Sequence, residues 1–350
     1  MTTLTDIRTA AAERFFGAEA DRLARLCLAM AERFARGGRL LATGTSAAEW
    51  SDARHVAVEF VHPVIVGKRA LPALALPPDE VSAHVRTDDM LIAFGPVPEV
   101  SADCLLITFA APDDDVFVAQ ELVETAYHVL WELVHVFFDH LPRAGAGTGA
   151  SSFLYPFLGG GTVDMEPVVA DVRASVLAKG AEAAALRAQT LAHNDDVLTA
   201  AARAVRGCGT ILALGNGGSA TDAMDAVADL RVGGTVRALD LTADAAILTA
   251  IANDIGTDAL FSRQVIAYGQ PGDGLLAFTT SGNSTNVIAA LAEARRRGLV
   301  TVAFVGYGGG SIAADALADH VVVVRSEHIP RIQEAQGSAW HVLRERICQG

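Results

Sequence analysis

Residues 212–230, LALGNGGSATDAMDAVADL, join the end of a strand, a glycine-rich turn and the start of a helix. Leu212–Leu214 form an apolar run, Gly215–Ser219 form the turn, and a helical period begins at Thr221. Such a turn offers backbone N–H groups and a helix N-terminus to an anion, and glycine lets a phosphate approach closely. The turn lacks the Lys of a P-loop and the spacing of a dinucleotide fingerprint. It therefore predicts either a site for another phosphorylated ligand or an ordinary glycine-rich turn.

Composition narrows the class of protein. The chain has 350 residues, 51% of them hydrophobic, and a formal net charge of −14. This length suits two domains, and the acidic charge argues against a nucleic-acid partner. There is no long uncharged apolar run and no signal-like start, so we expect a cytoplasmic protein that does not associate with a membrane. The four cysteines lack C-x-x-C spacing, which favours reduced thiols.

Helices and strands alternate along the whole chain, which predicts parallel sheets flanked by helices. One segment, residues 143–165, breaks this alternation and is rich in Gly, Ser, Thr and Pro. We interpret it as a linker between domains at 1–142 and 166–350. Its apolar stretch FLYPFL is expected to dock on one of the domains.

Matches between the two halves indicate a tandem repeat. DARHVAVEF at 52–60 resembles DAMDAVADL at 222–230, an offset of 222 − 52 = 170. AQELVETAYHVL at 119–130 resembles IQEAQGSAWHVL at 332–343, an offset of 332 − 119 = 213. The offset grows along the chain, so the first copy is expected to be the shorter one.

A second turn in the C-terminal half is rich in hydroxyl groups. The apolar strand GLLAF leads into TTSGNS at 279–284, and a helix is expected to begin near Asn286. Hydroxyls and helix N–H groups can hold a phosphate dianion without Lys or Arg. A Ser/Thr helix cap would produce similar letters, so this alternative remains open.

The second half resembles the sugar isomerase (SIS) domain and, within it, the phosphoheptose isomerases. The matching stretches are GNGGSATDAM (215–224), LTAIANDIGTDALFSRQV (248–265), PGDGLLAFTTSGNSTNVIAAL (271–291) and RIQEAQ…H (331–341). The resemblance implies a five-stranded parallel sheet flanked by helices, a phosphosugar at the carboxyl ends of the strands, and aldose–ketose isomerisation. The first half looks like a degenerate copy. The expected fold class is therefore α/β, with two tandem SIS domains, each a doubly wound, flavodoxin-like parallel sheet.

The resemblance also implies a set of substrate-binding residues in the second half. They are Asn216, Gly217, Gly218, Ser219, Asn253, Asp254, Thr279, Thr280, Ser281, Ser284 and Gln333.

The phosphoheptose isomerases carry a His and a Glu four apart after the glycine turn, and a Gln and a His eight apart on the last helix. In the second repeat the first two positions hold aspartates, and the set is Asp225, Asp229, Gln333 and His341. The first repeat has all four residue types, as His55, Glu59, Gln120 and His128, but lacks the phosphate-binding turns. Residues of these types can hold a zinc ion that polarises a carbonyl group.

This complementarity leads to the hypothesis of one composite site between the repeats. The second repeat would supply the phosphate turns, and the first would supply Glu59 and His128 as the acid–base pair. The expected zinc ligands are His55, Glu59, Gln120 and His128, and no nucleotide cofactor is expected. The fallback lies within the second repeat, with Asp229 and His341 as the acid–base pair and Asp225, Asp229, Gln333 and His341 as ligands. In a further alternative the first repeat is purely structural.

Three functions remain open at this level. The leading one converts sedoheptulose 7-phosphate to D-glycero-D-manno-heptose 7-phosphate. The second is a non-catalytic, phosphosugar-binding or regulatory protein, which the altered aspartates favour if the composite site does not exist. The third keeps isomerisation but changes the sugar phosphate. Two tandem chains would mimic the family's tetramer, so the resemblance predicts a homodimer.

Overall fold

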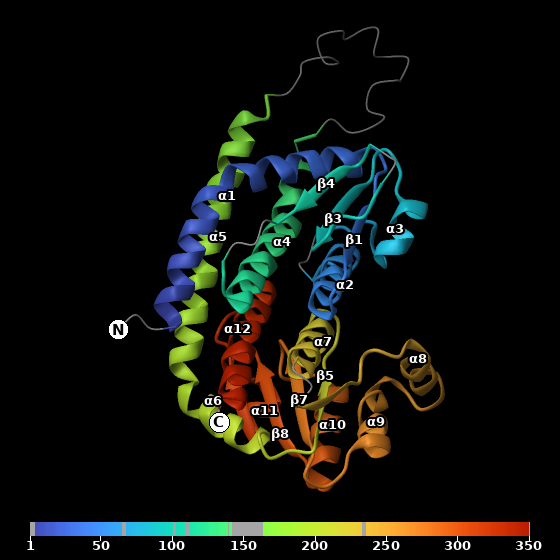
Figure 1. The fold of residues 1–350 in the computed structure, drawn as a ribbon, viewed down its shortest axis with the longest axis vertical. Coiled ribbons are helices and arrows are strands. Elements are labelled where there is room, and N and C mark those ends of the chain that lie inside the picture. The colour runs from blue at the N-terminus through green and yellow to red at the C-terminus, as the bar shows by residue number, and fades with distance from the viewer. Residues whose placement is uncertain are drawn as a thin grey trace.

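The structure, a computed structural model, describes most of the chain (Figure 1). The described residues are 4–64, 68–100, 103–109, 113–138, 140–141, 164–232 and 236–349. Most of the expected linker, including FLYPFL, lies outside them. All four cysteines are free thiols. No helix in the described ranges is long and apolar enough to span a bilayer.

The first repeat contains a parallel sheet with the strand order β2-β1-β3-β4. Its strands are β1 (Leu40–Gly44), β2 (Ala73–Ala75), β3 (Met90–Phe94) and β4 (Leu105–Thr108). Its helices are α1 (Leu4–Ala35), α2 (Ala47–Val61), α3 (Pro78–His84) and α4 (Val116–Phe138). Every residue of β1 and β3 is buried, as expected for parallel strands covered on both faces.

The second repeat contains a five-stranded parallel sheet with the order β6-β5-β7-β8-β9. Its strands are β5 (Thr210–Leu214), β6 (Arg237–Asp240), β7 (Gly274–Thr279), β8 (Val300–Val305) and β9 (His320–Val323). Its helices are α5 (Glu166–His193), α6 (Asp195–Val205), α7 (Gly218–Arg231), α8 (Ala245–Asp254), α9 (Ser262–Tyr268), α10 (Thr285–Arg296), α11 (Gly310–Ala314) and α12 (Ile329–Cys348), with a 3₁₀ turn at Thr257–Ala259. This strand order is the flavodoxin-like one, and the first sheet repeats its first four strands. The expected fold class is confirmed.

Four helices from the two repeats, α2, α4, α7 and α12, lie between the sheets (Figure 1). Where α2 meets α7, Ser51 Oγ donates a hydrogen bond of 2.9 Å to the backbone oxygen of Thr221. Arg54 Nη1 lies 3.7 Å from Met224 Sδ. Both pairs join positions that the repeat relates, since 221 − 51 and 224 − 54 are both 170. Contact between equivalent positions is the mark of two-fold packing, so the repeats form a pseudo-dimer within one chain.

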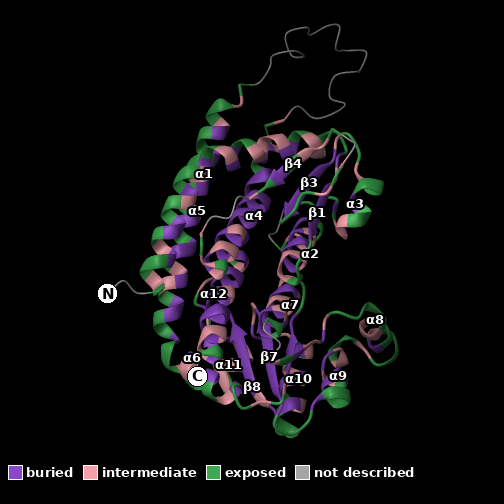
Figure 2. Cartoon of the chain, viewed as in Figure 1, coloured by how far each residue is buried: buried purple, intermediate pink, exposed green. Residues whose placement is uncertain are grey.

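Helix α5 runs along α1 and also packs against α12, so it touches both repeats (Figure 1). Buried residues gather in the sheets and along the helices between them, whereas α8 is largely exposed (Figure 2). At the α1–α5 contact, Gly180 faces the ring of Phe16, and a Cβ atom added at Gly180 would lie 2.5 Å from that ring. Close approach of the two helices therefore depends on glycine at this position.

This contact gives a stability prediction. Gly180→Val should lower the free energy of unfolding by about 1–3 kcal/mol, because the added side chain overlaps a buried ring. Gly17→Ala on the facing helix is the matched control, since an added Cβ there meets nothing within 4 Å. It should raise stability by about 0.5–1 kcal/mol. Chemical denaturation measures both, and equal effects of the two variants would contradict the close packing.

Candidate active site between the repeats

Two turns of the second repeat come together at one edge of its sheet. They follow β5 and β7, which are hydrogen-bonded neighbours, so both turns lie at carboxyl strand ends. The side-chain amides of Asn216 and Asn286 bond to each other reciprocally at 2.9 Å and tie the turns together. Gly217 has a φ of 58°, which favours glycine. Eight of the predicted substrate-binding residues belong to these turns: Asn216, Gly217, Gly218, Ser219, Thr279, Thr280, Ser281 and Ser284.

Helices of both repeats approach the first of these turns. A Cβ atom added at Gly218 would overlap the Nε2 atom of Gln333 on α12 and would lie 3.0 Å from Nε2 of His55 on α2. Glycine at this position therefore lets the backbone approach both side chains. The glycine turn of the second repeat thus lies directly beside a histidine of the first.

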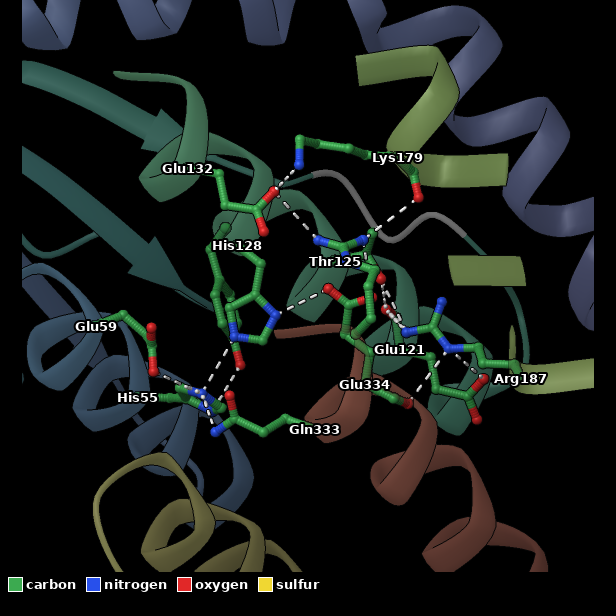
Figure 3. Close-up of polar contacts among 12 residues, drawn as sticks. His55, Glu59, Glu121, Thr125, His128, Glu132, Lys179, Arg187, Gln333 and Glu334 are labelled. Carbon is green, nitrogen blue, oxygen red and sulfur yellow. Dashed lines mark hydrogen bonds and ion pairs between the residues drawn. The ribbon is translucent and has the colours of Figure 1, made fainter. Parts of the chain in front are cut away.

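His55 is the centre of a buried polar cluster (Figure 3). Its Nε2 atom lies 3.2 Å from Nε2 of His128, 3.4 Å from Nε2 of Gln333 and 3.8 Å from Oε1 of Glu59. Oε2 of Glu59 has no hydrogen-bond partner among the described residues. The structure therefore brings together three predicted residues of the first repeat, His55, Glu59 and His128, with Gln333 of the second.

Burial controls the protonation of this cluster. It lowers the pKa of His55 well below its usual range, and the neighbouring His128 adds to the effect. It raises the pKa of Glu59 to about 7, although His128 acts in the opposite direction. Burial also acts to lower the pKa of His128, but its hydrogen bond to Glu334 and the nearby carboxylates outweigh burial and raise it. A neutral imidazole at His55 and a carboxylate poised near neutrality form a set that can bind a metal or move protons.

The cluster also has the donor atoms of a metal site. One ligand atom each from His55, Glu124 and His128 lie within 4.8 Å of one another, the one such group in the part of the chain that the structure describes. Glu124 is not among the residues predicted from the sequence. Its spacing from His128 is 128 − 124 = 4, which puts both on one face of α4 and could have revealed it. Two imidazoles with nearby carboxylates are typical zinc ligands.

The prediction that Gln120 is a ligand beside His128 needs correction. Both residues lie on α4, and eight residues of α-helix rise about 12 Å, too far for two ligands of one ion. Gln120 instead lines cavities with Asp52. Gln333 of α12 lies beside His55 in the place expected for Gln120. On both α4 and α12, the last helices of the two repeats, the Gln and the His therefore lie at opposite ends of the interface between the repeats.

In the fallback set, Gln333 and His341 are likewise eight residues apart on one helix. Gln333 lies beside His55, whereas His341, eight residues later on α12, lies 2.9 Å from Oε1 of Glu121 and stacks on Phe117. Asp229 accepts a hydrogen bond of 2.8 Å from Nε1 of Trp340.

Asp225 is half-buried, and its Oδ1 atom has no hydrogen-bond partner among the described residues. The four fallback ligands Asp225, Asp229, Gln333 and His341 therefore do not meet at one point.

Asn253 and Asp254, also predicted to bind substrate, lie at the end of α8. Both are exposed, and Asn253 Nδ2 donates to Asp254 Oδ1 at 2.7 Å. Figure 1 places α8 at the outer side of the second repeat, away from α2 and α12. The structure thus does not join this pair to the His55 cluster.

A cavity of about 420 Å³ occupies the pseudo-symmetric position in the first repeat. Its lining includes Gly95 and Gln120 of that repeat and Asp229 of the second. A side chain of the same repeat occupies the N–H donors of the turn before α2. Glu49 Oε2 accepts hydrogen bonds from the backbone N–H groups of Thr45 and Ser46, both at 2.8 Å. The hydroxyl of Thr45 donates to the same oxygen at 2.6 Å. A carboxylate thus holds the place where a phosphate could meet these donors.

Comparisons with known proteins show the family and the fold of the chain. The sequence profile of the SIS domain matches residues 180–306. The phosphoheptose isomerase of Nitratidesulfovibrio vulgaris is 40% identical over 183 residues, covering 49% of this chain and 86% of that protein.

Two solved structures share the fold over both repeats. The C-terminal domain of glucosamine-fructose-6-phosphate aminotransferase from Francisella tularensis has a TM-score of 0.62 at 10% identity and covers 97% of this chain and 92% of that one. Tagatose-6-phosphate ketose/aldose isomerase from Escherichia coli has a TM-score of 0.56 at 14% identity and covers 99% and 94%. At these identities the likeness concerns the fold alone.

Buried carboxyls between the repeats predict a pH-dependent stability. Asp52, Glu124, Asp222 and Asp225 surround a cavity of about 20 Å³. Burial, with smaller contributions from Glu49 and Asp229, raises the pKa of Asp52 to about 8. The folded chain therefore binds a proton that the unfolded chain has lost, and stability falls as pH rises toward 8.

Asp52→Asn should remove this loss. The free energy of unfolding of the variant relative to the wild type should rise by roughly 1.4 kcal/mol per pH unit between about pH 5 and pH 7. Urea denaturation at several pH values measures the difference. A difference that stays constant over this range would show that Asp52 is ionised in the folded chain.

Proposed function

The chain belongs to the phosphoheptose isomerase family of SIS-domain enzymes and is an isomerase, and from this premise we propose that it interconverts a ketose phosphate and an aldose phosphate at one composite site. The observation that carries the proposal is the convergence of His55, Glu59 and His128 of the first repeat with Gln333 and the glycine turn of the second. The leading substrate is sedoheptulose 7-phosphate, with D-glycero-D-manno-heptose 7-phosphate as the product.

The two turns of the second repeat would hold the phosphate. Their backbone N–H groups and the hydroxyls of Thr279, Ser281 and Ser284 can donate to its oxygens, and Asn216 fixes one turn against the other. Phosphate held at this edge would place the rest of the sugar toward the side chains beside Gly218. This arrangement supports a single productive orientation of the substrate.

Glu59 would carry the proton. It takes a proton from the carbon beside the carbonyl and returns it to the former carbonyl carbon, while the hydroxyl proton moves between the two oxygens. Its unpartnered Oε2 atom and its pKa of about 7 suit this task, because a base works best near the ambient pH. Return of the same proton leaves the enzyme unchanged after each turnover.

A metal ion fits the donor set, and we propose zinc. His55, His128 and Glu124 would hold it together with Oε1 of Glu59 and Oε1 of Gln333. Gln333 thus replaces Gln120 of the expected set. When bound, the ion would supply Lewis-acid stabilisation of negative charge on the substrate oxygens. His128 was predicted to serve both as acid and as ligand. Its ring nitrogens face Glu334 and His55, which supports the role of ligand.

The composite site predicts different outcomes for two carboxylate variants. Glu59→Gln should lower kcat for isomerisation of sedoheptulose 7-phosphate by roughly 100-fold or more, because it removes the proton acceptor. Asp229→Asn should stay near the wild-type rate, because Asp229 lies at the pseudo-symmetric cavity. Formation of the aldose phosphate measures both rates.

Loss of activity in Asp229→Asn alone would place the reaction in the second repeat and refute the composite site. Phosphosugar binding without turnover by the wild type would favour the regulatory alternative. A panel of ketose phosphates decides the sugar, and faster turnover of a shorter one would replace sedoheptulose 7-phosphate as the substrate.

A further inference from the structure

Two histidine–glutamate pairs cross between the repeats. Nδ1 of His128 on α4 lies 2.9 Å from Oε1 of Glu334 on α12. Nδ1 of His341 on α12 lies 2.9 Å from Oε1 of Glu121 on α4. The pairs are related by the repeat, because 334 − 121 and 341 − 128 are both 213. All four side chains are buried.

Arginines anchor both glutamates. Arg331 Nη1 lies 3.0 Å from Oε2 of Glu334, and Arg8 Nε donates to Oε1 of Glu121 at 3.0 Å. Arg187 of α5 bridges the two, because it donates to the backbone oxygens of Glu121 at 2.7 Å and Glu334 at 3.4 Å. The two oxygens of Glu334 thus face different partners, His128 at Oε1 and the Arg331 guanidinium at Oε2. These contacts fix Glu334 as a carboxylate acceptor.

This acceptor determines which nitrogen of His128 carries a proton. A carboxylate can only accept, so Nδ1 of His128 must donate to Glu334. In the neutral ring Nε2 then has a free lone pair, and that lone pair faces Nε2 of His55 at 3.2 Å.

The contacts of His55 favour the same tautomer, with the proton on Nδ1. Nδ1 of His55 lies 3.2 Å from the hydroxyl of Tyr127, and that hydroxyl donates to Oδ1 of Asp52 at 3.3 Å. With the tyrosine proton directed to Asp52, the tyrosine oxygen can accept a hydrogen bond from Nδ1 of His55. Two Nε2 lone pairs therefore converge in a buried place, an arrangement that a cation between them stabilises.

We propose that Glu334 is a positioning residue that holds His128 as the Nδ1–H tautomer and thereby directs its Nε2 atom to the metal of the composite site. This rests on the proposed function, in which His128 is a ligand. The pair works across the repeats, since the first repeat supplies the ligand and the second supplies the group that orients it. Carboxylate–histidine pairs of this kind orient the ligand and raise its basicity.

The related pair does not serve a metal. The position equivalent to His55 in the second repeat is Asp225, so no second imidazole faces His341, and the His341 ring stacks on Phe117 with centroids 4.6 Å apart. Glu121 has the same charge, burial and partner type as Glu334. It is therefore a matched control for the structural part of the interaction.

The experiment compares Glu334→Gln with Glu121→Gln in the full chain. Zinc affinity is measured by competition with a chromophoric chelator in the absence of substrate, and the ring nitrogens of His128 are followed by ¹⁵N NMR in the metal-free wild type. Glu334→Gln should weaken zinc binding by about 10–100-fold. Glu121→Gln should leave zinc affinity near that of the wild type, and the wild-type spectrum should show His128 protonated at Nδ1.

Equal zinc affinity in Glu334→Gln and the wild type, or protonation of His128 at Nε2 alone, would overturn the proposal. If Glu334→Gln does not fold, the wild-type spectrum decides. Both readouts are independent of turnover. A chain that binds zinc with this tautomer but does not isomerise sugar phosphates would therefore refute the proposed function and leave the role of Glu334 intact.

Discussion

The packing of α2 and α4 against α7 and α12 is the constraint on which the site depends. Contacts between repeat-related positions, such as Ser51 with Thr221, set the two sheets about a pseudo-two-fold axis. This packing brings α2 of one repeat to the glycine turn of the other, so that Gly218 meets His55 and Gln333. Neither repeat contains this arrangement alone, and the linkage of both in one chain guarantees their pairing.

The pseudo-symmetry also generates a second possible site, at the cavity lined by Gly95, Gln120 and Asp229. Its residues differ from those of the His55 cluster. At that location Glu49 takes the turn's N–H donors, and aspartates replace the His and Glu of α2. His341 is engaged with Glu121 and Phe117. A tandem chain can lose one of two related sites because each copy mutates separately, whereas identical subunits must keep both. The asymmetry of the two repeats thus concentrates donor atoms at one end of the interface.

Much of this arrangement could be read from the sequence. The alternation of helices and strands predicted the parallel sheets, and the complementary residue sets of the two repeats led to the hypothesis that His55 meets the second repeat. The prediction for Gln120 was wrong because the four residues of the family pattern were assigned to one ion from a single repeat. Eight residues of α-helix separate Gln120 from His128, so the two cannot ligate the same ion. The pairing of Glu334 with His128 could not be predicted, because it depends on how two helices meet. The capping box of Ser46 and Glu49 and its consequence for the cavity were found only in the structure.

The most direct test of the composite site is anomalous diffraction at the zinc absorption edge, on crystals of the full chain grown with zinc. The account predicts one strong peak per chain, between the imidazoles of His55 and His128 and within reach of Gln333. A peak beside His341 and Asp229, or zinc held only at the protein surface, would contradict it.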